Sequence, residues 1–269
     1  MPDPDADLTL IEEAVRDAGA IARKFYKGSY RKWDKGKGQP VTECDLAVDE
    51  FLAQRLLGAR RDYGWLSEET EDDPARLRAE RVFVVDPIDG TVAFLKGRPY
   101  FTICAAVVHD GRSVVGAVYN PITGESFTAI RGQGAKLNGK PIHVSQRTEL
   151  EGARILGPKT TFEHHAWKGA PEVDWPPMHV ETRNSVAYRL ALTACGSFDA
   201  TIALSAKHDW DLAAGDLIVQ EAGGRVTTHT GTAIRYNGAS PVQPSVVAAG
   251  PALHETIVSL VKNLKLPAA

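Results

Sequence analysis

Two aspartates three residues apart follow a short apolar segment of the chain. Val82-Phe83-Val84-Val85 is a β-branched run that predicts a buried strand, which we expect to end at Asp86-Pro87. Asp86 and Asp89 can converge there on a hard cation, since such cations prefer oxygen ligands. Gly90 and Thr91 would let a phosphate approach the backbone, and a helix beginning there would offer it free amides. The pattern predicts a metal and phosphate site, although ordinary helix capping by the same residues would also explain it.

Three further acidic segments contain residue types, at suitable spacings, that could also bind a metal ion. Glu68 and Glu69 end an apolar stretch, and adjacent carboxylates repel one another unless a cation lies beside them. Asp211 would lie at the N-terminus of a helix, and Thr42 with Asp45 has the spacing of a capping box. Each segment also has a structural interpretation, as an acidic loop for the glutamates and as helix caps for the others.

In the first half of the chain, hydrophobic periodicity predicts the helices and strands that position these residues. Steps of three and four residues predict a helix over 8–25, capped by Asp5 or Asp7. A second helix is predicted over 45–57, with its inward face formed by Phe51, Leu52 and Leu56. Alternating runs and turn residues then predict an antiparallel meander with strands at 103–108, 114–119 and 126–130 and a hairpin turn at Asn138-Gly139.

The second half of the chain has a different order of elements. It alternates predicted strands at 153–156, 199–203, 225–228 and 246–249 with predicted helices at 185–195, 212–222 and 252–264. We therefore predict an α+β subdomain over 1–150 with an antiparallel sheet and most of the candidate metal ligands. An α/β subdomain over 151–269 would supply Asp211. The charged segment 32–40 is predicted to be a mobile loop, and 158–177 a domain junction or surface excursion.

Composition excludes several classes of protein. At 269 residues, with 43% hydrophobic and 24% charged residues, the chain is long and apolar enough to build a core without disulfides. A net charge of −3 argues against nucleic-acid or membrane partners. The three cysteines lack CxxC spacing, which indicates buried thiols in a reducing compartment. The acidic N-terminus does not resemble a signal peptide, and no apolar run has membrane-spanning length, so we expect a cytoplasmic protein.

Together the acidic segments resemble the inositol monophosphatase family over nearly the whole chain. Asp86-Pro-Ile-Asp-Gly-Thr91 is similar to the first signature of that family at every position. The second signature of the family is matched by Trp210-Asp211-Leu-Ala-Ala-Gly215 together with Glu221-Ala-Gly-Gly224, which are similar to it. Glu68-Glu69 and Thr42-x-x-Asp45 lie at the intervals that the family pattern requires.

The resemblance implies a role for each matched residue. Two or three Mg²⁺ ions, for which Mn²⁺ can substitute, would be bound by the side chains of Glu68, Asp86, Asp89 and Asp211 and by the main-chain carbonyl of Ile88. Gly90 and Thr91 would bind the phosphate through their amides. Asp45, paired with Thr91 or acting through Glu68, would help to deprotonate a metal-bound water. The resemblance also implies a layered αβαβα sandwich of the inositol monophosphatase and fructose-1,6-bisphosphatase type, a homodimer, and inhibition by lithium.

The chemistry of phosphate esters agrees with such a site. A phosphate monoester dianion repels hydroxide, so hydrolysis needs both an activated water and neutralisation of charge, and two magnesium ions can provide both. We therefore predict a magnesium-dependent phosphomonoesterase that acts on a small phosphorylated metabolite. A non-catalytic, metal-binding scaffold is the alternative from another class.

The substrate is less constrained than the reaction. Inositol-directed members similar to the animal enzymes carry a glutamate shortly before the Trp-Asp pair, whereas 203–208 contains no carboxylate. Ser67 before the acid pair and Lys207-His208 resemble bacterial 3'(2'),5'-bisphosphate nucleotidases, and Lys207 would hold a second phosphate or be a solvated loop residue. We favour the nucleotidase activity. Inositol-1-monophosphatase, histidinol-phosphate phosphatase and fructose-1,6-bisphosphate phosphatase are the alternatives.

Overall fold

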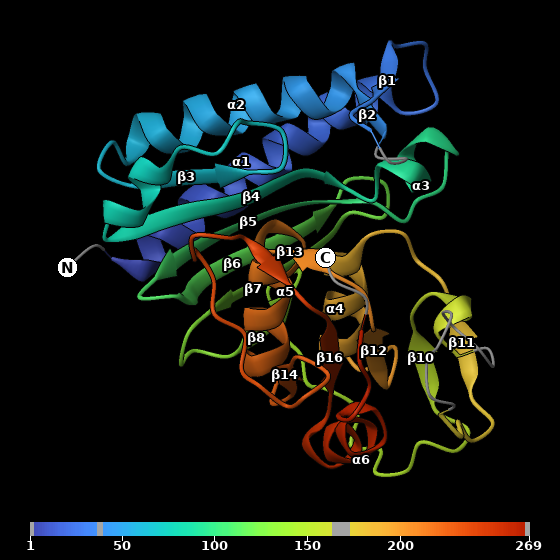
Figure 1. The fold of residues 1–269 in the computed structure, drawn as a ribbon. Coiled ribbons are helices and arrows are strands. Elements are labelled where there is room, and N and C mark those ends of the chain that lie inside the picture. Colours follow the sequence, from blue (N-terminus) through green and yellow to red (C-terminus); the bar gives the residue numbers. More distant parts are fainter. Residues whose placement is uncertain (1–2, 37–39, 163–172, 267–269) are drawn as a thin grey trace.

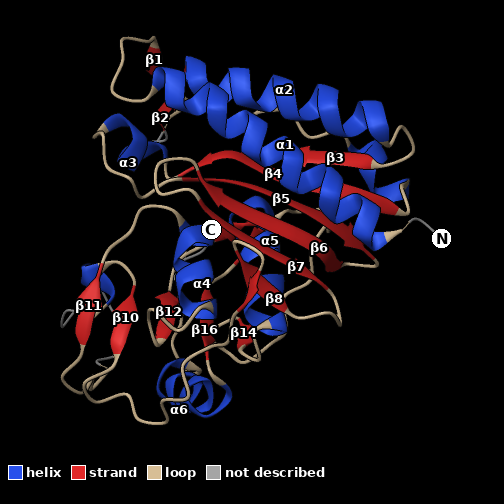
Figure 2. Ribbon diagram, turned by 180° about the vertical axis from the view of Figure 1, so that it is seen from behind, coloured by secondary structure: helices blue, strands red, loops and turns tan. Residues whose placement is uncertain are grey.

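Two β-sheets with helices on both faces organise the chain (Figure 1). The computed structural model describes residues 3–36, 40–162 and 173–266. Helices α1 (Pro4–Phe25) and α2 (Glu43–Ala59) cover the outer face of the larger sheet, as the reverse view also shows (Figure 2). Helices α4 (Val186–Ala194) and α5 (Asp209–Glu221) lie between the sheets, and α6 (Pro251–Val261) covers the far side of the smaller one. This is the predicted αβαβα sandwich.

The larger sheet is mostly antiparallel and contains the predicted meander. Its strands, in spatial order, are β3 (Gly64–Ser67), β4 (Arg81–Asp89), β5 (Thr102–His109), β6 (Arg112–Asn120), β7 (Glu125–Ile130), β8 (Ala135–Leu137) and β9 (Lys140–Pro141). In β4, Phe83 and Val85 pack toward α1 and α2, whereas Val82 and Val84 pack toward α4 and α5. Both faces are apolar because helices bury both of them. The turn predicted at Asn138-Gly139 joins β8 to β9.

The smaller sheet is mixed. Its strands, in spatial order, are β11 (His179–Glu181), β10 (Arg154–Leu156), β12 (Ala200–Ala203), β16 (Val246–Ala249) and β14 (Arg225–Thr227). β10 is parallel to both of its neighbours, whereas β16 is antiparallel to both of its own. Ile202 and Val247 face α6, and Val246 and Ala248 face the central helices, so this sheet too has two apolar faces.

The predicted starts of two helices are wrong. The cap of α1 is Asp3, not Asp5 or Asp7. Asp7 is instead fully buried, and its carboxylate accepts hydrogen bonds from Arg60, Tyr63 and Arg81. Helix α5 begins at Asp209, three residues before the predicted start, which makes Asp211 its third residue.

Shorter elements complete the described chain. Part of the segment predicted to be a mobile loop forms a hairpin of β1 (Lys32–Asp34) and β2 (Pro40–Thr42). The remaining elements are β13 (Lys207–His208), β15 (Val242–Gln243), α3 (Thr91–Leu95) and the 3₁₀ helices η1 (Pro74–Arg78) and η2 (Lys159–Thr161). The predicted excursion at 158–177 lies partly outside the described residues. Within the described ranges, every helix is too short or too polar to cross a membrane.

Candidate active site

Strand β4 carries both aspartates of the central motif. The strand continues to Asp89, rather than ending at Asp86 as predicted, and its register against β5 shifts between these two residues. In a regular strand, side chains three positions apart point to opposite faces. The irregularity is therefore the feature that lets both carboxylates face the same side.

Asp211 joins them from the other half of the chain. One carboxylate oxygen each from Asp86, Asp89 and Asp211 lies within 4.8 Å of the other two; we call these three residues the acidic cluster. The carboxylate of Asp211 also accepts the His208 amide at 2.8 Å, which is a capping-box bond at the start of α5. The N-cap of α5 is His208, so the predicted N-cap role of Asp211 is wrong; from the third helical position Asp211 makes the reciprocal capping-box bond and also belongs to the acidic cluster.

Asp86 has one oxygen that the protein does not use. Its Oδ1 accepts the Ile88 amide at 3.0 Å. Its Oδ2 is buried and has no hydrogen-bond partner among the described residues. A buried, unpaired carboxylate oxygen is costly, and here it belongs to a cluster of two more acids. The donor set is entirely oxygen, which fits hard divalent cations such as Mg²⁺.

Asp89 is bound to the N-terminus of α4. Its carboxylate accepts hydrogen bonds from Ser185 Oγ at 2.6 Å and from the amides of Val186 at 3.1 Å and Ala187 at 2.6 Å. These amides belong to the first turn, where helical N–H groups lack intrahelical partners. No local sequence pattern indicates these contacts. The Ser185 cap was a local signal, but its partner lies 96 residues away.

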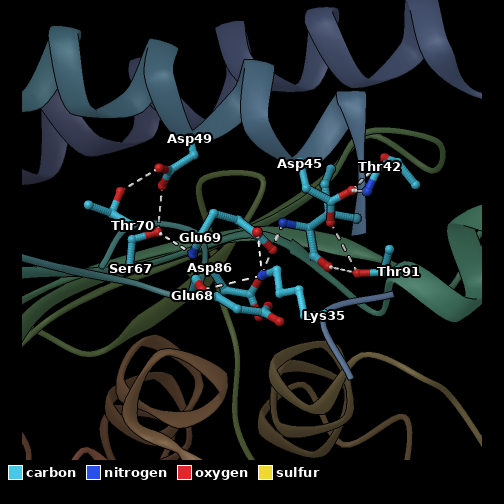
Figure 3. A network of polar contacts seen from close by, with 11 residues as sticks. Lys35, Thr42, Asp45, Asp49, Ser67, Glu68, Glu69, Thr70, Asp86 and Thr91 are labelled. Atoms are coloured by element: carbon cyan, nitrogen blue, oxygen red, sulfur yellow. Dashed lines mark hydrogen bonds and ion pairs between the residues drawn. The ribbon is translucent and has the colours of Figure 1, made fainter. Parts of the chain in front are cut away.

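Glu68 lies in the loop after β3, beside the acidic cluster (Figure 3). Burial, then the charges of Glu69 and Asp211, raises the pKa of Glu68 to about 8. Lys35, which sequence analysis did not select, forms an ion pair with Glu69 and donates to the Glu68 carbonyl at 3.4 Å. The charge of Glu68 contributes to the raised pKa of Asp86, but its carboxylate is not one of the three that form the acidic cluster, so its role as a metal ligand stays a prediction.

Asp45 connects helix α2 to the turn after β4. Its Oδ2 accepts the amide and hydroxyl of Thr42, which confirms the predicted capping box, and its Oδ1 accepts Thr91 Oγ1 at 3.1 Å. Thr91 Oγ1 also lies 3.1 Å from the carbonyl of Ile88. Gly90 has φ +97°, and a Cβ there would lie 2.9 Å from both the Ser185 nitrogen and the Tyr100 carbonyl oxygen. The turn therefore requires glycine.

The electrostatics of the cluster favour cations. Burial, followed by the charges of Glu68, Asp89 and Asp211, raises the pKa of Asp86 well above its usual range. Burial and the charge of Asp211 raise the pKa of Asp89 to about 7, against the opposing hydrogen bonds from α4. Burial also raises the pKa of Asp211. Burial and mutual repulsion thus make the charged forms of these carboxylates unfavourable unless a counter-charge lies beside them.

A cavity of about 640 Å³ opens beside the cluster, and Glu68, Asp89 and Asp211 form part of its wall. Lys207 and His208, the predicted substrate-contacting residues, also line this cavity, although Lys207 Nζ turns back to Ser205 Oγ at 2.9 Å. His208 is stacked on Trp210 with a centroid distance of 4.5 Å and an interplanar angle of 4°. Arg189, which no sequence motif indicates, lines the cavity from α4. Only 4% of this residue is exposed, and its Nη1 has no hydrogen-bond partner within the described part of the chain.

Comparison with known proteins identifies similar chains. A profile of the Inositol monophosphatase family matches residues 3–266. Inositol monophosphatase 3 of Solanum lycopersicum is 35% identical over 84% of this chain and 87% of its own length. Inositol-1-monophosphatase of Rhizobium meliloti is 33% identical over 90% of this chain and 91% of its own. The structure of extragenic suppressor protein suhB from Bartonella henselae superposes with a TM-score of 0.83 at 28% identity, covering 96% of this chain and 99% of that one.

Proposed function

Since the chain belongs to the inositol monophosphatase family, whose members are phosphoric monoester hydrolases, we propose that it is a magnesium-dependent phosphatase of a small metabolite. We assign the magnesium ligands as Glu68, Asp86, Asp89, Asp211 and the carbonyl of Ile88. The observation that carries this assignment is the unpaired, buried Oδ2 of Asp86 within a cluster of carboxylate oxygens no more than 4.8 Å apart.

Divalent cations bound there would neutralise phosphate charge and make water more acidic. The backbone and side chains of the protein would bind the phosphate and accept a proton. The left-handed conformation of Gly90 forms the turn that leads into α3, and the amides at the start of α3 would bind the phosphate oxygens. Asp45 is buried, which raises its pKa, so its carboxylate is a better proton acceptor than a surface aspartate. Thr91 Oγ1, which donates to Asp45 Oδ1, would pass a proton from the attacking water to that oxygen.

Within this class we favour 3'(2'),5'-bisphosphate nucleotides as substrates. Arg189 and Lys207 supply two cations to the cavity wall, and the unpaired Nη1 of Arg189 is suited to a second anionic group. The stacked His208–Trp210 pair offers an aromatic surface beside them. Inositol 1-phosphate is the second candidate, because relatives with 33–35% identity carry the name of that activity.

The test is phosphate release from 3'-phosphoadenosine 5'-phosphate, inositol 1-phosphate, fructose 1,6-bisphosphate and histidinol phosphate, with magnesium and then with EDTA. We expect magnesium-dependent turnover and a preference for the bisphosphate nucleotide. Arg189→Met should reduce that preference more than it reduces turnover of inositol 1-phosphate. A wild-type preference for inositol 1-phosphate would contradict the nucleotidase assignment, and absence of turnover on all four would favour a metal-binding scaffold. A homodimer and lithium inhibition follow from the family resemblance and stay predictions.

A further inference from the structure

Helix α2 presents two aspartates, one turn apart, to the site. Asp45 contacts the turn that contains Thr91, as predicted. Asp49, four residues later on the same face of α2, contacts the loop that carries Glu68 (Figure 3). Only 8% of Asp49 is exposed, and the sequence signatures do not include it.

Asp49 binds this loop on both sides of the adjacent glutamates. Ser67 Oγ donates to its Oδ1 at 2.5 Å, and Thr70 Oγ1 donates to its Oδ2 at 2.6 Å. Each oxygen of one carboxylate therefore secures one end of the segment 67–70. Hydrogen bonds to an ionised acceptor are about twice as strong as those between neutral groups.

The segment 67–70 has few other strong contacts. Strand β3 ends at Ser67, and the next regular element, η1, begins at Pro74. The amide of Glu68 lies 3.4 Å from the Val85 carbonyl, and Lys35 reaches the Glu68 carbonyl at 3.4 Å, which are long hydrogen bonds. Apart from the Lys35–Glu69 ion pair, the two bonds to Asp49 are the shortest at this segment among the described contacts.

We propose that Asp49 is a positioning residue that fixes Glu68 for metal binding through Ser67 and Thr70. This inference rests on the proposed function, because it takes Glu68 as a metal ligand. Glu68 and Glu69 repel each other and the acidic cluster. Without the two bonds, the segment would move away from that repulsion, and the metal site would lose one preorganised ligand. Outer partners of metal ligands typically contribute 10- to 100-fold in metal affinity.

Thr70 offers a matched pair of variants at an exposed position. Thr70→Ser keeps the hydroxyl that Asp49 accepts, whereas Thr70→Val keeps the shape and removes the hydroxyl. We expect Thr70→Ser to bind magnesium within twofold of the wild type, and Thr70→Val to bind it several-fold more weakly, as measured by calorimetry. Equal affinities for the two variants would overturn the proposal.

Asp49→Ala should weaken magnesium binding by about 10- to 100-fold, and at saturating magnesium its KM for substrate should stay within about threefold of the wild type. Adding Thr70→Val to Asp49→Ala should cause no further loss, because Asp49→Ala already removes the bond that Thr70 donates. The control is Asp199→Ala, which deletes a buried carboxylate beside β12, away from the cluster, and should leave magnesium affinity unchanged. Thermal unfolding of each variant separates lost stability from lost affinity.

A readout without metal completes the test. In EDTA, amide hydrogen exchange over 68–72 should be faster in Asp49→Ala than in the wild type, while exchange in β5 should be equal in both. Wild-type magnesium affinity in Asp49→Ala, or unchanged exchange, would overturn this inference alone. A wild-type protein that fails to bind magnesium would overturn the proposed function and this inference with it.

Discussion

Replacing Asp86 with asparagine should have opposite effects on the metal-free and metal-bound protein. The amide oxygen can keep the bond that Oδ1 accepts from the Ile88 amide, and the nitrogen takes the place of the unpaired Oδ2. Two unit charges 4.8 Å apart, the upper limit within the acidic cluster, interact by about 3.5 kcal/mol at an effective dielectric constant of about 20. Burial and these neighbours raise the pKa of Asp86 and so disfavour its charge in the metal-free protein. Asparagine removes that unfavourable charge, so the metal-free variant should be at least as stable as the wild type.

With magnesium the same change removes a ligand. For a lost attraction of about the same size, 3.5 kcal/mol, affinity should fall by roughly 300-fold. At a magnesium concentration 100 times the wild-type Kd, binding stabilises the wild type by about 2.7 kcal/mol, whereas the variant should gain only about 0.2 kcal/mol. Turnover should be abolished, because only about a quarter of the variant sites would hold metal at that concentration and each of them would lack one ligand.

The assay is chemical unfolding of both proteins in EDTA and at that magnesium concentration. Asp62→Asn, which removes an exposed charge outside the site, is the control and should retain the full magnesium-dependent gain. A gain of about 2.7 kcal/mol in Asp86→Asn, with near-normal turnover, would refute the assignment of Asp86. Strong destabilisation of the metal-free variant would show instead that the carboxylate supports the fold.

Three further predictions concern stability. Leu52→Ala, at a fully buried position of α2, should lower the free energy of unfolding by roughly 2–5 kcal/mol, and an unchanged value would contradict its place in the core. Asp7→Ala should lower it by about 3–5 kcal/mol, because Arg81 would be left buried without its counter-charge; thermal and denaturant unfolding measure this, and a loss below about 1 kcal/mol would show that the group is solvated. Burial raises the pKa of Asp216 from an ordinary 3.8 to about 6, so the folded state binds the extra proton and the contribution of Asp216 to stability falls as pH rises from about 4 to about 6. The free energy of unfolding of the wild type relative to Asp216→Asn should therefore fall by up to about 3 kcal/mol over that range, and a difference independent of pH would contradict the raised pKa.

Features that depend on neighbours in the chain were predictable from sequence. Apolar runs separated by turn residues identified β5, β6 and β7, and the three-residue spacing of Thr42 and Asp45 identified the capping box that opens α2. The acidic segments and their order were enough to assign the family, because metal and phosphate chemistry restricts residue types at a few positions. The errors at the ends of α1 and α5 arose because several acids near a helix start can cap it equally well in a local pattern.

Only the packing of the layers decided which distant side chains meet. Nothing near Asp89 in sequence indicates that Ser185 and the first turn of α4 bind its carboxylate, and Asp7 had the local pattern of a cap although it is a buried ion-pair partner. The irregularity in β4, the bonds of Asp49 to Ser67 and Thr70, and the unpaired Nη1 of Arg189 likewise depend on how elements pack. Sequence fixes residue types and local geometry, whereas burial and pairing across layers are set by long-range contacts that no local pattern contains.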